Sequence, residues 1–231
     1  MCTSSNNKNK RTRASILVES NNRCIIVDTS TDLRCQCLAN KVKRIDAVLY
    51  THTHADHLYG VDDLRIYNFL QHSKIPIYGS EETIEKMNNA FAYLFTDAVS
   101  GGGKPYLIPN ILNGPMDLFG IHIVPVEIMH GSLPIVGFKF EKLAYLTDAS
   151  EIPADSMELL QGLDCLIIGA LRHDPHPTHF TIEQAVDLIR EIKPKQAYLT
   201  HLGHSVEHAE LTNSLPDGIA PAYDGLEITL P

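Results

Sequence analysis

The stretch Leu49-Tyr50-Thr51-His52-Thr53-His54-Ala55-Asp56-His57 holds three histidines and one aspartate within six positions. A short apolar run leads into this stretch and is typical of a buried strand. Side chains alternate along an extended segment, so His52 and His54 point to the same side and can bind one metal ion. Asp56 and His57 follow where the chain turns, and we expect them to reach a second ion. A His-rich surface loop is the plain alternative, which the preceding strand disfavours.

Length and charge bound the class of protein. The chain has 231 residues, enough for one large domain or two small ones, and we expect a single domain over residues 1–231. The formal net charge of -9 disfavours a general nucleic-acid surface. Residues 1–13 are nevertheless basic, and we interpret them as a solvated arm.

The chain contains no long apolar run, and its N-terminal segment is rich in Asn, Ser and Lys. We therefore expect neither a signal peptide nor an association with membranes. The five cysteines are an odd set without the spacing of a disulfide framework. Together these features favour a reducing, cytoplasmic setting.

Apolar patterns predict strands near both ends of the chain and helices between them. Residues 15–19 and 24–28 are expected to form a hairpin around the Asn21-Asn22 turn. The strand over residues 75–78 contains Pro76 and should therefore lie near a sheet edge. Residues 96–115 form the longest irregular stretch, either a mobile loop beside the site or a plain surface excursion. The pattern as a whole predicts two packed sheets with helices outside.

The clearest helix of the chain begins after Thr181. Thr181 and Gln184 form a capping-box pattern, and Pro194 stops the helix. Apolar residues at helical spacing indicate one buried face.

Four residues of metal-binding types follow apolar strands at their carboxyl ends, namely His52, His130, Asp148 and His201. Strand ends in packed sheets can converge on one edge, which is where sites in α/β proteins are commonly built. A single histidine after a strand is more often a satisfied polar group than a ligand. Four such positions together with the compact first cluster indicate a metal site.

The candidate ligands suffice for two metal ions. They divide into His52, His54 and His130 for one ion, Asp56, His57 and His201 for the other, and Asp148 as a bridge between them. A hydroxide between the ions completes the expected site. Two ions about 3.5–4 Å apart lower the pKa of bound water from about 15.7 towards 7, which provides a nucleophile at neutral pH. The nitrogen and oxygen ligands suit Zn²⁺ or Mn²⁺ and do not choose between them.

In their order along the chain, these ligands resemble the motifs of the metallo-β-lactamase superfamily, including its HxHxDH signature. Within the superfamily, nearly the whole chain is similar to the phosphoribosyl cyclic phosphodiesterase of the carbon–phosphorus lyase pathway and its hydrolase relatives. The segments that carry this similarity are residues 199–204, 213–218 and 223–228. The resemblance implies an αββα sandwich of two mixed sheets with outer helices.

Residues at two positions disfavour two branches of this superfamily. Asp148 stands where true β-lactamases often have cysteine, so lactamase activity is disfavoured. His54 stands where the di-iron oxygen reductases of this fold carry glutamate, which disfavours that redox branch.

The resemblance also implies catalytic residues. Asp56 is expected to act in catalysis as well as in metal binding. His179 is expected at the substrate phosphate, as a hydrogen-bond donor to a phosphoryl oxygen or as the acid for the leaving oxygen. From the residues alone, His173 and His176 are rivals of His179. His179 has the advantage of lying immediately before the helix that begins after Thr181, whose N-terminus would attract an anion.

Relatives carry a glycine-rich first strand and a C-x-C-x-x-C knuckle that binds a structural zinc. This chain begins Met1-Cys2-Thr3-Ser4, so only Cys2 and His204 would remain of that site. We therefore expect the first strand to be missing and the structural zinc to be absent or incomplete.

These inferences predict a binuclear metal-dependent hydrolase, and specifically a phosphodiesterase for a small cyclic or diester phosphate of the phosphoribosyl cyclic phosphate type. A tRNA 3′-processing endonuclease of the same fold is one alternative, supported by the basic segment alone. A non-catalytic metal-binding domain is another, and thioester or lactone hydrolysis stays open. The expected binding partner is a small phosphate ester, and nucleic acid is less favoured. For the oligomeric state, a homodimer is one alternative.

Overall fold

The computed structural model describes residues 3–96 and 103–230. The chain forms two compact units. The N-terminal unit consists of Arg13–Ile121, and the C-terminal unit consists of Met1–Thr12 together with His122–Pro231. The expectation of one domain stays a prediction.

The N-terminal unit contains a mixed five-stranded sheet in the order β1-β2-β3-β4-β5. Its strands are β1 (Ile16–Ser20), β2 (Arg23–Val27), β3 (Ala47–Leu49), β4 (Ile75–Gly79) and β5 (Leu107–Ile111). Its helices are α1 (Leu33–Ala39), α2 (Ala55–Leu58), the 3₁₀ helix η2 (Val61–Leu64), α3 (Arg65–Gln71), α4 (Glu81–Ala90) and α5 (Ala92–Phe95). Strands β2, β3, β4 and β5 are parallel, which brings their carboxyl ends to one edge of the sheet.

The predicted first hairpin is confirmed. Strands β1 and β2 pair antiparallel, with Ser20 opposite Arg23. Asn21 and Asn22 both have positive φ, of 50° and 59°. This left-handed backbone matches the strand twist in a two-residue hairpin, and asparagine tolerates it well.

Pro76 lies near a sheet edge as predicted, because within the described residues β4 is the neighbour of the outermost strand β5 and has β3 on its other side. The amide of Ile75 donates to the carbonyl of Tyr106 next to β5, so position 76 faces the other neighbour. That neighbour, β3, is short, and its register with β4 begins only at Val48 opposite Ile77. The ladder therefore requires no N–H from Pro76.

Residues 96–115 were expected to be irregular, yet they contain β5, which pairs parallel with β4. Residues 97–102 of this stretch lie outside the described part. Strand β5 contains Pro109 and is largely exposed, so it has no alternating apolar pattern. Its pairing with β4, rather than its own sequence, establishes it as a strand.

The C-terminal unit is built on the second mixed sheet, which has the order β12-β11-β10-β9-β8-β7-β6 within the described residues. The strands are β6 (Met116–Leu118), β7 (Ile121–His130), β8 (Leu133–Phe140), β9 (Leu143–Leu146), β10 (Cys165–Gly169), β11 (Gln196–Thr200) and β12 (Ile219–Pro221). By residue range, β6 and the first residue of β7 belong to the N-terminal unit. The helices are the 3₁₀ helix η1 (Asn7–Asn9), α6 (Ala154–Leu159), α7 (Ile182–Ile192) and α8 (His208–Ser214). Strands β9 to β12 are parallel, whereas β7, β8 and β9 are antiparallel. The apolar pattern of residues 226–230 also predicts a strand, which does not form.

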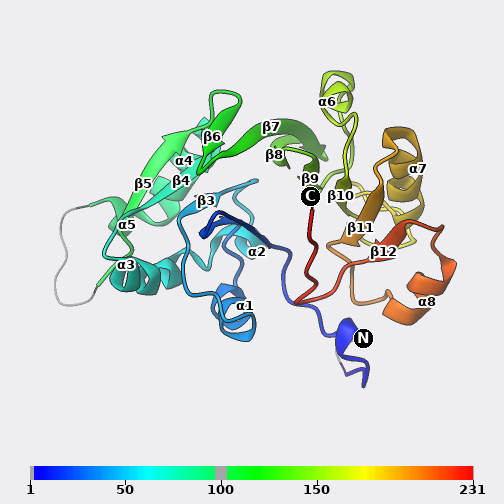
Figure 1. Ribbon diagram of the computed structural model, residues 1–231, viewed down its shortest axis with the longest axis horizontal. Coiled ribbons are helices and arrows are strands. Elements are labelled where there is room, and N and C mark those ends of the chain that lie inside the picture. Colours follow the sequence, from blue (N-terminus) through cyan, green and yellow to red (C-terminus); the bar gives the residue numbers. More distant parts are fainter. Residues whose placement is uncertain (1–2, 97–102, 231) are drawn as a thin grey trace. The chain divides into compact units, whose positions relative to one another are not determined.

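Two mixed sheets with helices are the parts of the predicted metallo-β-lactamase αββα class, and this fold class is confirmed. Helix α7 illustrates why the sequence folds in this way. Its apolar stripe is buried in the core of the C-terminal unit, where α7 packs beside β10 and β11 (Figure 1). The N-terminal unit has a core of its own around Ile45, Leu64 and Ile77.

The capping box at the start of α7 gives a first testable prediction. The Thr181 hydroxyl accepts a hydrogen bond from the Gln184 amide, and the Gln184 side chain accepts one from the Thr181 amide. We expect Thr181→Ala to lower the free energy of unfolding by about 1 kcal/mol, because a helix N–H loses its acceptor. Urea unfolding followed by circular dichroism measures this change. Glu191→Ala on the exposed face of α7 is the control and should stay within about 0.5 kcal/mol of the wild type.

The interpretation of the N-terminal segment as a solvated arm is wrong for several of its residues. Asn9 is buried and Arg11 is partly buried. Arg11 donates to backbone carbonyls more than 190 positions away in the sequence, and Lys8 lies 4.1 Å above the ring of Tyr223. The composition of this segment predicts solvation, because it cannot reveal partners that lie far away along the chain.

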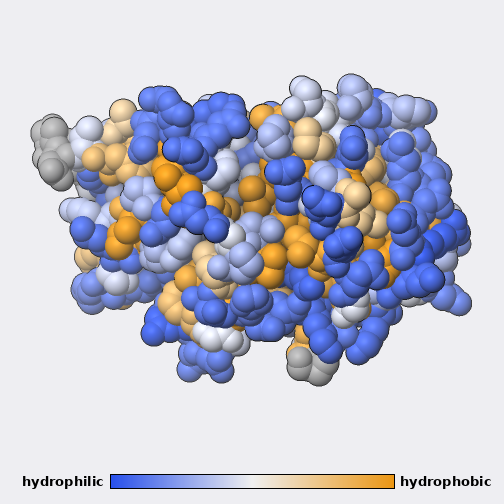
Figure 2. All heavy atoms as spheres, turned by 90° about the horizontal axis from the view of Figure 1, so that it is seen from above, coloured by the Kyte–Doolittle hydropathy of each residue, from blue (hydrophilic) through white to orange (hydrophobic). Residues whose placement is uncertain are grey.

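The surface is mostly hydrophilic with separate apolar patches on the face shown in Figure 2. In the N-terminal unit, Phe69 and Leu70 on α3 are 71% and 56% exposed. None of the helices within residues 3–96 and 103–230 is long and apolar enough to span a membrane.

Candidate metal centre

The N-terminal unit gathers the side chains of its His/Asp motif just after β3. The ring centroid of His52 lies 4.6 Å from that of His54 and 4.3 Å from that of His57. Asp56 Oδ2 lies 3.8 Å from His57 Nε2. His52 and His57 are buried, whereas His54 is exposed, so the cluster is fixed on one side and accessible on the other.

A residue that the sequence analysis did not select, Asp28, anchors this cluster. Asp28 follows β2 directly, adopts φ 64° and is fully buried. Its carboxylate accepts hydrogen bonds from the Thr51 amide (2.8 Å), the Thr51 hydroxyl (2.8 Å) and His57 Nδ1 (2.7 Å). The available signal was an acid at the end of an apolar strand that becomes the neighbour of β3.

These contacts determine which nitrogen of each ring carries the proton. A carboxylate only accepts, so His57 Nδ1 holds a proton and the lone pair of the neutral ring is on Nε2. The Thr51 hydroxyl gives its single proton to Asp28, so His52 Nδ1 must donate to that hydroxyl at 2.9 Å. His52 Nε2 is therefore also a lone-pair donor. One buried carboxylate thus prepares two imidazoles for a metal ion.

Burial affects the electrostatics of this anchor. It raises the pKa of Asp28, while the attraction of His57 and the hydrogen bonds from His57 and Thr51 act in the opposite direction. An anchoring carboxylate in such a place favours cationic neighbours.

The C-terminal unit brings together its own set of predicted residues. His130 is the last residue of β7, Asp148 follows β9, and His201 follows β11 directly. One ligand atom each from Asp148, His179 and His201 lie within 4.8 Å of one another. His201 Nε2 lies 3.3 Å from Asp148 Oδ1, which also accepts the Thr147 hydroxyl proton.

Parallel pairing explains the approach of Asp148 and His201. Strands β9 and β11 flank β10, so their carboxyl ends meet at one edge. At that edge Gly169 ends β10, and a Cβ atom there would lie 2.9 Å from the Asp148 amide nitrogen. Asp148 and His201 both adopt left-handed backbone, with φ of 59° and 55°. Residues held in this sparsely populated region often belong to functional sites.

The three histidines of the 173–179 loop occupy different surroundings. His179 stacks on His201 with a centroid distance of 5.0 Å and an interplanar angle of 17°, and it lies 4.6 Å from His130. His173 is paired instead with Glu183, at 2.6 Å. His176 reaches only the edge of the group, 4.9 Å from His179. The catalytic role of His179 stays a prediction.

The imidazole of His179 is neutral near pH 7. Burial lowers its pKa to about 4; Asp148 opposes this effect, and the neighbouring histidines add to it. A neutral imidazole still donates one N–H hydrogen bond.

The donor set of both units suits a divalent metal ion. His130 Nδ1 donates to the carbonyl of Thr178 at 2.7 Å, so His130 Nε2 is a lone-pair donor like those of His52 and His57. Hydrogen-bonded Nδ1 atoms of this kind are typical of metal-binding histidines. Two units thus each carry a His/Asp cluster suited to a divalent metal, which does not distinguish Zn²⁺ from Mn²⁺.

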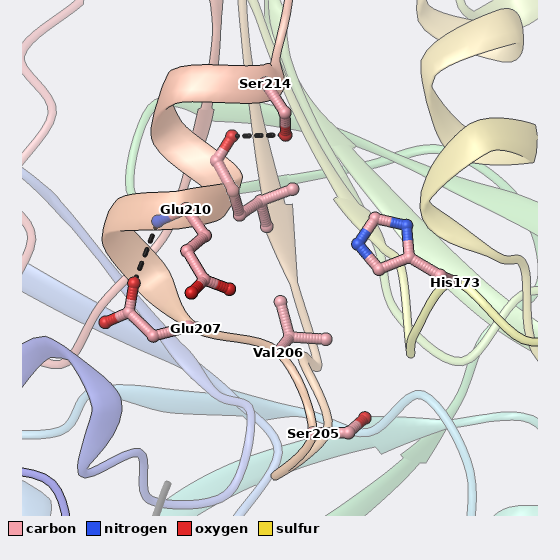
Figure 3. Close-up of a pocket in the computed structure, with 7 residues that line it drawn as sticks. His173, Ser205, Val206, Glu207, Glu210 and Ser214 are labelled. Carbon is pink, nitrogen blue, oxygen red and sulfur yellow. Dashed lines mark hydrogen bonds between the residues drawn. The ribbon is translucent and has the colours of Figure 1, made fainter.

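A pocket of about 270 Å³ is lined by residues that are near His179 and His201 in the sequence (Figure 3). His173 lines one side of the pocket, and residues 205–207 with α8 line the other. These lining segments continue into His179 and His201. None of the residues assigned to metal binding lines the pocket itself.

The fold and the site define the class of protein. The family model of the beta-lactamase superfamily domain matches residues 23–202, and the chain belongs to this superfamily. It has the metallo-β-lactamase fold and carries His/Asp clusters suited to a divalent metal ion.

Two relatives resemble the chain over its length. A crystal structure of a diphosphatase from the PhnP family is 37% identical, with a TM-score of 0.93, and covers 100% of this chain and 89% of that one. A Porphyromonas gingivalis (strain ATCC BAA-308 / W83) protein named octanoyltransferase is 36% identical over an alignment 231 residues long, which covers 98% of this chain and 46% of that protein. The chain therefore spans about half the length of this curated relative.

A more distant structure shares the fold. Human tRNase Z, short form, is 20% identical with a TM-score of 0.72, covering 95% of this chain and 93% of that one. Identity at this level supports the fold alone.

The expected loss of the structural zinc concerns Cys2 and His204. Cys2 lies outside the described residues, and His204 is exposed. This expectation stays a prediction.

Proposed function

We propose that the chain is a binuclear metal-dependent phosphodiesterase acting on a small cyclic or diester phosphate. The observation that supports the substrate class is the 37% identity to a PhnP-family diphosphatase over the whole chain. Hydrolysis of a diphosphate and of a phosphodiester share one reaction type, because water displaces an oxygen leaving group from phosphorus. The same residues can therefore serve either substrate.

The proposed ligand assignment follows the sequence prediction. The ligands are His52, His54 and His130 for one ion, Asp56, His57 and His201 for the other, and Asp148 shared between them. The protonated Nδ1 atoms of His52, His57 and His130 support this assignment, because they leave the Nε2 lone pairs for metal.

When bound, two divalent ions supply an activated water at neutral pH and offset charge on the phosphoryl oxygens. The chain's own residues orient and compensate these charges. Asp148 supplies a buried negative charge beside His201. His179, neutral and next to both His130 and His201, donates an N–H hydrogen bond to a phosphoryl oxygen.

A substrate panel tests the proposal. A cyclic ribose phosphate, a generic aryl phosphodiester, a nucleoside diphosphate, a tRNA precursor and an acyl thioester are each assayed with Zn²⁺ and with Mn²⁺. We expect hydrolysis of the first two, and of the diphosphate at a comparable or lower rate. Metal-dependent turnover of the thioester alone would overturn the proposal.

The panel also covers the other functions. The name of the P. gingivalis relative applies to a protein about twice as long as the matched part, and the thioester assay tests whether acyl chemistry belongs to this part. Cleavage of the tRNA precursor with a salt-sensitive gel shift would favour the endonuclease. Bound metal without turnover of any substrate would favour a non-catalytic domain.

His179 provides a prediction specific to phosphoryl chemistry. We expect His179→Ala to lower kcat by about 100- to 1,000-fold, because a hydrogen bond that forms to the charged transition state is lost. The metal content should not change, since His179 is not assigned as a ligand. Steady-state kinetics and elemental analysis measure the two effects. The control is His176→Ala, which should retain activity within a few-fold, and equal losses in the two variants would contradict the assignment.

A further inference from the structure

Residues 6–12, which we call the strap, cross the loop that follows His201. The strap and this loop are about 195 positions apart in the sequence, yet they share several hydrogen bonds within the C-terminal unit. The strap also bonds at its end to Asp224, whose carboxylate accepts from the Thr12 amide at 2.9 Å.

Arg11 holds the beginning of the loop. Its Nη1 donates to the carbonyls of Gly203 (3.3 Å) and Val206 (3.0 Å). The Gly203 carbonyl also accepts from the Val206 amide at 3.2 Å, so Arg11 closes a short turn. Burial lowers the pKa of Arg11, and the nearby charges of Glu207 and Asp224 act in the opposite direction.

Asn9 holds the end of the loop. Its side-chain carbonyl accepts from the His208 amide at 2.8 Å, and its side-chain amide donates to Glu207 Oε1 at 2.6 Å. Glu207 Oε2 in turn accepts the Glu210 amide at the start of α8, as Figure 3 shows. Both ends of the loop are thereby bound to the strap.

The loop requires such support because of its place in the chain. It begins at His201, whose left-handed φ of 55° costs conformational energy. Residues 201–207 contain neither helix nor strand. The Gly203 amide donates to the Leu171 carbonyl at 2.7 Å, so the strap and the segment that follows β10 both hold the turn next to His201.

We propose that Arg11 is a positioning residue that holds the loop of His201 in the conformation required for metal binding. This inference rests on the proposed function, because it takes His201 as a ligand. Arg11 acts through the backbone of the loop. It donates hydrogen bonds to the carbonyls two and five residues beyond His201, and these hydrogen bonds fix where the His201 backbone lies. The ring position against His179 and Asp148 follows from that backbone.

The test compares Arg11→Ala and Arg11→Lys with the wild type in two measurements. In the metal-free protein, hydrogen exchange of the loop amides should become about tenfold faster in Arg11→Ala. In the metal-loaded protein, chelator competition should show an affinity for one ion that is lower by about 10-fold or more, similar to the loss of an outer-shell partner. Arg11→Lys keeps the charge but not the planar guanidinium that places Nη1 between the two carbonyls, and its values should fall between those of Arg11→Ala and the wild type.

Controls separate positioning from a general loss of stability. Lys10→Ala removes an exposed cation of the strap whose Nζ reaches only Asn7, and it should match the wild type in both measurements. Added guanidinium at millimolar concentration should restore metal retention to Arg11→Ala but not to His201→Ala. A merely structural role would not produce this selective rescue.

The outcomes distinguish this inference from the proposed function. If His201→Ala loses an ion while Arg11→Ala and Arg11→Lys retain both, the positioning role is overturned and the ligand assignment stands. If His201→Ala retains both ions, the ligand assignment fails, and the positioning role fails with it even where loop exchange quickens.

Discussion

Replacing Asp148 by asparagine is expected to lower kcat/KM for a phosphodiester by about a thousandfold. Asp148 is buried and lies 3.3 Å from His201 Nε2, and we propose that its charge is shared by the two metal ions. Offsetting cationic charge is worth several kcal/mol, and each factor of ten in rate corresponds to about 1.4 kcal/mol. Steady-state kinetics and metal analysis of the purified variant measure the loss.

Asparagine is the better replacement here because of the backbone. Asp148 has φ 59°, which asparagine adopts readily, whereas alanine would add strain. The variant therefore removes charge and keeps the fold. Asp155→Ala on the exposed side of α6 is the control and should retain activity. A loss of less than tenfold in Asp148→Asn would show that this carboxylate does not bridge the ions.

The second large effect is expected for Asp28→Asn. Asp28 accepts from three donors, and an asparagine amide nitrogen would meet one of them with a second donor in either orientation. If the amide faces His57, it also faces the Thr51 hydroxyl, and the ring must accept at Nδ1 and carry its proton on Nε2, which prevents metal binding there. We expect metal affinity to fall by about 10- to 100-fold and the free energy of unfolding to fall by about 1–3 kcal/mol.

Asp46→Asn is the matched control for this variant. Asp46 is also a buried aspartate of the N-terminal unit, and it accepts from Arg23, Arg44 and the Cys24 amide. Its replacement should lower stability without changing metal affinity, because no candidate ligand contacts it. Calorimetric unfolding and chelator competition on both variants separate the two effects. Equal metal affinity in Asp28→Asn and wild type would refute the anchoring role.

The local sequence pattern was sufficient to predict several helices and strands. The apolar stripe and capping box of α7 appear as predicted, because helix periodicity and end signals lie within a dozen residues. The Asn21-Asn22 hairpin is correct for the same reason. Strand β5 was mispredicted as irregular, because it depends on which strand lies alongside, and a partner strand leaves no mark in the segment itself.

By itself, the sequence determined the superfamily fold, and it predicts the metal-binding residues because three histidines and an aspartate in six positions after an apolar run are typical of a metal site. Only the tertiary structure revealed Asp28 as the anchor of two histidines and the strap as the support of the His201 loop. It also placed His179, rather than His173, beside His130 and His201. The physical reason is that ligand identity is a property of side-chain chemistry, whereas ring protonation and loop support come from hydrogen bonds between segments distant along the chain.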